Sequence, residues 1–83
     1  MDINTIITLE DQTKYVLLDK LTKNKKKYFF AIKLDQEDNP TIVYEIFELE
    51  KSNKDTYMNI VEDENLRENI FLEFTNNYIN RED

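Results

Sequence analysis

Carboxylates are the residues of this chain with the clearest potential for acid–base chemistry, because it contains 18 Asp and Glu but no His and no Cys. Two pairs have a suggestive spacing: Glu48 with Glu50, as on one face of a strand, and Glu64 with Glu68, as on one face of a helix. Such a pair works as general acid and base only when one member is desolvated. Asp and Glu are rarely buried without a partner, so we predict solvated acids and no catalytic residue.

The same two pairs support a different hypothesis, in which the acidic side chains imitate the phosphates of a nucleic acid backbone. Alternate residues of a strand lie about 6.8 Å apart and helical i, i+4 neighbours about 6 Å apart, a spacing similar to that of successive phosphates. A mimic of this kind would occupy a basic nucleic-acid-binding channel. The alternative function is therefore a phage-type inhibitor of a nuclease or a CRISPR effector, and its binding should weaken as ionic strength rises.

Two other charged segments are weak candidates for ligand sites. The acidic residues within 35–40 resemble a calcium-binding loop, but the loop lacks the required glycine and ends in Pro40. The lysine run at residues 23–27 could contact phosphate, but only Tyr28 adjoins it among the aromatic residues. We expect a polar loop and a solvated hairpin tip, and hence no metal, no cofactor and no direct nucleic acid binding.

Charge is distributed unevenly along the chain, whose net charge is −7. Residues 1–33 carry seven Lys and four acids (+3), whereas residues 34–83 carry four bases and fourteen acids (−10). This balance repels nucleic acid and anionic lipid and favours a protein partner with a basic surface. The longest wholly apolar run, residues 28–32, is far shorter than the ~20 residues that span a bilayer. We expect a cytoplasmic domain, which also fits the absence of Cys.

Period-two hydrophobic patterns predict five strands, over residues 5–9, 15–22, 28–34, 42–50 and 56–61. The segments between them are short and polar, which permits hairpins but not the long crossovers of a parallel sheet. The chain has no Gly for the tight turns, so Asn24, Asn39 and Asn53 are expected to supply positive φ angles.

After residue 61 the period changes to that of a helix, predicted over residues 64–78. Its apolar stripe is formed by Leu66, Ile70, Phe74 and Tyr78, and Asp63 can cap its first turn. The predicted fold is α+β: one domain, residues 1–83, with a five-stranded antiparallel meander followed by one C-terminal helix packed on a sheet face.

Leu72 and Ile79 lie opposite the apolar stripe of the predicted helix, so both are expected to be exposed in a monomer. Scattered surface hydrophobes are common in folded proteins and offer one interpretation. A contact with another chain, in a homodimer or with a different protein, is the other.

Five short motifs are spread along the chain: ITLED (7–11), YVL (15–17), KYF (27–29), IVYEI (42–46) and NIVEDE (59–64). Together they resemble the YrzB-like domain of unknown function, a family of short acidic proteins of low-GC Gram-positive bacteria. The resemblance covers nearly the whole chain and supports the fold, but it implies no activity and no residue roles. Lys26 stands where the family tends to have Gly.

Taken together, these features predict a non-enzymatic protein-binding or regulatory domain that acts through its acidic surface. The residues predicted to contact the partner are Glu48, Glu50, Glu64, Glu68, Leu72 and Ile79.

Overall fold

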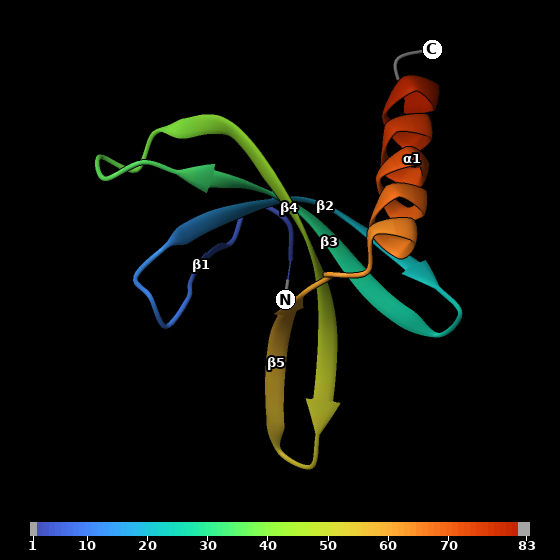
Figure 1. Ribbon diagram of the computed structural model, residues 1–83, viewed down its shortest axis with the longest axis horizontal. Helices are drawn as coiled ribbons and strands as arrows, with labels where there is room; N and C mark the ends of the chain where they lie inside the picture. The colour runs from blue at the N-terminus through green and yellow to red at the C-terminus, as the bar shows by residue number, and fades with distance from the viewer. Residues whose placement is uncertain (1, 82–83) are drawn as a thin grey trace.

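The computed structural model describes the backbone of residues 2–81 and the side chains of residues 2–77. It confirms the predicted meander of five antiparallel strands, in which each strand pairs with the next along the chain, and the helix that follows (Figure 1). The elements are β1 (Ile6–Thr8), β2 (Lys14–Lys23), β3 (Lys26–Leu34), β4 (Pro40–Ser52), β5 (Asp55–Ile60) and α1 (Glu64–Arg81). Tyr78 lies within α1, but its side chain is outside the described residues.

Hairpin turns without glycine are made by residues in the left-handed region. Asn24 and Lys25, between β2 and β3, have φ of 53° and 68°, and positive φ at both central residues is what a type I′ turn requires. Asn53, with φ of 53°, begins the turn between β4 and β5. The predictions for Asn24 and Asn53 are therefore confirmed. Other than Gly, Asn is the residue that most readily adopts this conformation.

The prediction for Asn39 is wrong, because the positive φ of that loop, 65°, occurs one residue earlier at Asp38. The Asp35 side chain decides this: its Oδ1 accepts hydrogen bonds from the amides of Glu37 and Asn39, both at 2.9 Å. The Asp35 amide in turn donates to the Asn39 carbonyl, at 2.9 Å. Hydrogen bonds between Asp35 and Asn39 therefore close the loop. The chain direction must reverse before Asn39, which places the positive φ at Asp38.

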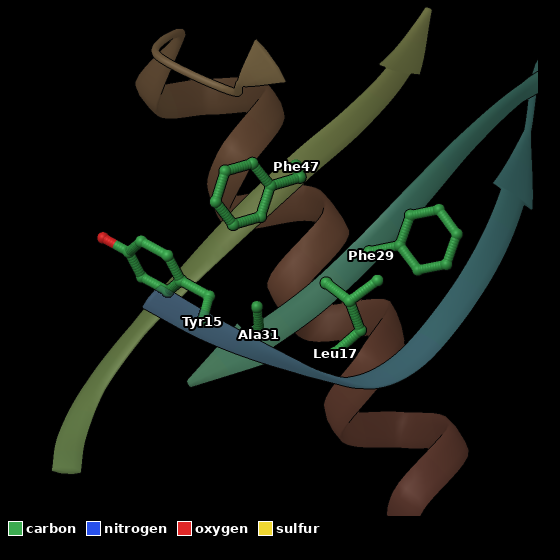
Figure 2. Close-up of a cluster of buried hydrophobic side chains, with 5 residues drawn as sticks. All are labelled: Tyr15, Leu17, Phe29, Ala31 and Phe47. Carbon is green, nitrogen blue, oxygen red and sulfur yellow. The ribbon is translucent and has the colours of Figure 1, made fainter. Parts of the chain in front are cut away.

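The sheet curls into a half-barrel whose inner side, here called the concave face, faces away from α1. Its buried side chains are Tyr15, Leu17, Phe29, Ala31 and Phe47. Figure 2 shows these side chains in front of their strands, with the helix behind. Among the residues that the structure describes, no helix covers this cluster. Partly buried apolar side chains pack against it instead: Ile7, Leu9, Leu49 and Met58.

The outer side, here called the convex face, carries α1 across β4, β3 and β2. The second buried cluster lies between helix and sheet and consists of Tyr28, Ile46, Val61, Ile70 and Phe74. Asp63 caps the helix as predicted, since its Oδ1 accepts a hydrogen bond from the Leu66 amide at 3.0 Å. Further along α1, Lys23 Nζ lies 2.9 Å from Glu73 Oε2 and joins the helix to the end of β2.

Candidate functional site

Three of the predicted partner-binding residues form one stripe along the outer side of α1. Glu64, Glu68 and Leu72 are spaced four residues apart, so they lie one above another on the helix surface. All three are exposed, Leu72 by 51%. The side chain of Ile79, the fourth residue predicted on this helix, lies outside the described residues.

Beside this stripe lies a hollow of about 310 Å³, here called the aromatic hollow, lined by Tyr44, Glu64, Arg67, Glu68 and Phe71. The Tyr44 and Phe71 rings stack with their centroids 4.8 Å apart and their planes inclined by 26°. Aromatic faces of this kind supply a large apolar contact area at a binding surface. The hollow thus combines an apolar surface with two exposed carboxylates.

Arg67 also lines the aromatic hollow, but its charge is already balanced. Its Nη2 lies 3.0 Å from Glu45 Oε1, and its Nε donates a hydrogen bond to the same oxygen at 3.2 Å. The guanidinium carbon lies 4.7 Å from the centre of the Tyr44 ring. Within the part of the chain that the structure describes, Glu64 and Glu68 form no ion pair. Their negative charge is therefore free to meet a cation from outside.

A row of apolar residues extends from the aromatic hollow across the convex face. Cross-strand pairing aligns Ile6 with Val16, Val16 with Ile32, and Ile32 with Tyr44, and residues directly opposite each other share a face. Ile6 is 53% exposed, and Ile42, on β4 two residues before Tyr44, is 97% exposed. We call Ile6, Val16, Ile32 and Tyr44 the apolar row. Sequence patterns located its strands but gave no indication of which face α1 would leave open.

The other predicted acidic pair lies in a different electrostatic environment. Lys26 Nζ is 3.2 Å from Glu48 Oε1, and this contact raises the pKa of Lys26 above its ordinary value. Asn59 Nδ2 donates a hydrogen bond to Glu50 Oε2 at 2.7 Å. The hollow that Glu48 and Glu50 line, about 650 Å³, is also lined by four lysines: Lys25, Lys26, Lys27 and Lys51. The two acidic pairs therefore line separate hollows, and lysines surround this one.

The described residues contain no group of three or more His, Cys, Asp or Glu side chains placed to hold a metal ion. The acids of the loop before β4 contribute to its own structure, since Asp35 binds the loop backbone and Asp38 Oδ1 lies 3.1 Å from Lys14 Nζ. Within the described part of the chain, α1 does not have the length and apolar character of a membrane-crossing helix.

Comparison of the chain with protein-family models, with curated proteins and with solved structures finds no match. The resemblance to the YrzB-like domains therefore stays a prediction, and function must be argued from the surfaces described above.

Proposed function

We propose that this chain is a non-enzymatic protein-binding domain of regulatory type, which holds a basic segment of a partner protein against α1 and the apolar row. The observation that carries the proposal is the position of Glu64 and Glu68 in the lining of the aromatic hollow, where both are exposed and form no ion pair with any described residue. Their charge complements a basic partner, which is steered to the surface by the excess of acids in residues 34–83.

The chemistry of the surface defines the partner segment. Lys or Arg side chains of the partner would pair with Glu64 and Glu68, and an aliphatic or aromatic side chain between them would cover Phe71 and the exposed Ile42. Interfaces gain most of their affinity from a few apolar or Arg anchors surrounded by polar contacts. Leu72 extends the apolar contact along the helix. Because the chain lacks Cys, the proposal places the domain in the reducing environment of the cytoplasm.

Nucleic acid mimicry, the alternative, receives less support from the arrangement of the acids. A mimic needs successive negative charges along one path, but Glu48 and Glu50 line a hollow with four lysines. Binding through the aromatic hollow needs only Glu64 and Glu68. The salt dependence of binding distinguishes the two hypotheses. An interface with an apolar core keeps more of its affinity at high ionic strength than a purely electrostatic interface does.

The experiment is affinity capture on the full chain, with captured proteins identified by mass spectrometry. The double variant Glu64→Lys/Glu68→Lys reverses the charge of the aromatic hollow and leaves both buried clusters intact. The matched control is Glu10→Lys/Glu37→Lys, which reverses two exposed acids that do not line the aromatic hollow. We expect a basic partner that still binds the control variant and no longer binds Glu64→Lys/Glu68→Lys.

A synthetic peptide of Lys and Leu, with the Leu residues on one helical face, provides a direct binding probe. Fluorescence anisotropy should show weaker binding to Ile42→Ser and to the double variant than to the unaltered chain. Capture of the same proteins by the double variant and the unaltered chain would overturn the assignment of this surface.

A further inference from the structure

The concave face carries a further hollow, about 400 Å³ in volume and lined only by neutral and basic residues. We call it the lysine hollow, and its lining residues are Thr5, Lys20, Lys27, Phe29, Leu49, Lys51 and Thr56. Three positive charges thus meet in one place in a chain whose net charge is −7. No Asp or Glu is among the described residues that line it.

Strand register explains why lysines from three different strands converge. Lys20 of β2 is paired with Phe29, and Lys27 lies two residues before Phe29 on β3 and therefore on the same face. Lys27 is paired with Leu49, and Lys51 lies two residues after Leu49 on β4. The three lysines thus form a diagonal across the sheet, along which successive Cα atoms are about 7–8 Å apart. Flexible four-carbon stems let their ammonium groups reach a common point.

Within the described chain, these lysines form few ion pairs with acidic residues. Lys27 and Lys51 form no ion pair with any residue that the structure describes. Lys20 has Asp2 at 3.5 Å, but the two side chains are 57% and 86% exposed, so water screens that pair strongly.

The nearest acids of β4, Glu48 and Glu50, alternate with Leu49 and Lys51 along the strand and do not line the lysine hollow. They line the neighbouring hollow of about 650 Å³, whose lining includes Lys27 and Lys51 as well. Glu48 is moreover paired with Lys26. Like charges gathered on one sheet face oppose folding, and a bound anion would remove that repulsion.

We propose that the lysine hollow binds an oligophosphate group, either inorganic or as the phosphate tail of a nucleotide. Lysine binds phosphate as a mobile point charge, and the hydroxyls of Thr5 and Thr56 can donate to further phosphate oxygens. The volume is at the lower end of the range for small-molecule sites, which suits an oligophosphate. This site lies on the face opposite α1 and is independent of the proposed protein-binding surface.

The experiment is isothermal titration calorimetry of the full chain with inorganic tripolyphosphate and, separately, with ATP, at low and at near-physiological ionic strength. Lys27→Gln and Lys51→Gln each remove one charge from the hollow. Lys54→Gln is the matched control, since Lys54 is an exposed lysine in the β4–β5 turn that does not line it. Loss of one charge-assisted contact should weaken tripolyphosphate binding about tenfold in each hollow variant and leave the control unchanged.

The two ligands distinguish the source of the phosphate. Equal affinity for tripolyphosphate and ATP supports a site that recognises phosphate alone, and tighter ATP binding supports a nucleotide site in which the partly buried Leu49 contacts the nucleoside. Equal weakening by all three Lys→Gln variants would mean attraction by diffuse charge and would overturn the site. Absence of binding at millimolar tripolyphosphate and low ionic strength would overturn it as well.

Discussion

The Arg67 guanidinium lies 3.0 Å from the Glu45 carboxylate and joins the first turns of α1 to β4. Both side chains are partly buried, with 32% and 18% of their surfaces exposed. Arg67 Nη2 also donates a hydrogen bond to the Tyr44 carbonyl at 3.4 Å. This contact fixes the helix over the aromatic hollow and balances the one positive charge that lines it. It thereby leaves Glu64 and Glu68 available to a partner.

Replacement of Arg67 by Lys tests whether the geometry of this contact matters beyond its charge. Lysine keeps the positive charge but cannot place two nitrogens on the Glu45 oxygen and stack its head on Tyr44. We expect Arg67→Lys to lower the free energy of unfolding by about 1 kcal/mol, measured by urea denaturation. Lys54→Arg, a change between the same two residue types at an exposed turn, should have no effect. An unchanged urea midpoint for Arg67→Lys would show that the contact contributes little.

Two isoleucines of β4 provide a matched pair for separating stability from binding. Ile46 is fully buried beneath α1, whereas Ile42 is 97% exposed. Ile46→Val should lower the free energy of unfolding by about 1 kcal/mol, because it removes a buried methylene and leaves a small cavity. Ile42→Val should change it by less than about 0.5 kcal/mol. Equal losses in thermal or urea unfolding would contradict the burial that the structure assigns to the two residues.

Much of the fold was accessible from the sequence, because its local signals agree with one another. Alternation along residues 28–34 identified a strand, and the four-residue spacing from Leu66 to Phe74 identified the helix. Asp63 was recognised as the cap because a side-chain oxygen at that position reaches the first free amides of the helix. Each of these inferences needs only neighbours within a few residues.

The candidate sites depended on relationships that the sequence does not contain. A register shift in the pairing of β2 with β3, between Leu17 and Asp19, and the curl of the sheet together decide which residues line the concave face. Lys51 is far from Lys20 and Lys27 along the chain and joins them only through the strand register. For the same reason, the spacing of Glu48 and Glu50 predicted a shared face but not the lysines around them.

Lys25 occupies a backbone conformation that costs energy for any residue with a Cβ atom. Its φ is 68°, in the second central position of the β2–β3 turn, where glycine is the preferred residue. Lys25→Gly should therefore raise the free energy of unfolding by about 0.5–1 kcal/mol in urea denaturation. Lys54→Gly, in the β4–β5 turn at a residue without positive φ, should bring no gain. A loss of stability in Lys25→Gly would argue against the type I′ turn.

Tyr15 should make stability fall at alkaline pH. Burial on the concave face, together with the negative charges of Glu45 and Asp11, raises the pKa of its phenol above the ordinary 10.0. The protonated phenol is thus favoured in the folded state, and this contribution is complete below the pKa of the unfolded chain. It is lost as the pH rises through the raised pKa, because the unfolded chain releases the proton first. Tyr15→Phe should reduce the fall in the free energy of unfolding above pH ~10. Chemical denaturation across that pH range measures this fall. The same decline in both proteins would assign it to other groups.

Repulsion within the lysine hollow should be measurable without any ligand. Lys51→Gln removes one of the three positive charges that line it, whereas Lys54→Gln removes an equal charge outside it. Both variants change the net charge from −7 to −8, so effects of the overall charge cancel when the two are compared. At low ionic strength Lys51→Gln should be the more stable of the two by about 0.3 kcal/mol, since like charges on one sheet face oppose folding.

Salt provides the control for that comparison, because screening shortens the reach of the repulsion to ~3 Å at about 1 M ionic strength. The difference between Lys51→Gln and Lys54→Gln should therefore disappear in concentrated NaCl, while a packing difference would persist. Thermal unfolding of both variants across a salt series measures this directly. Identical stabilities at every salt concentration would mean that the lysines do not affect one another, and the electrostatic reason for an anion in the hollow would be gone.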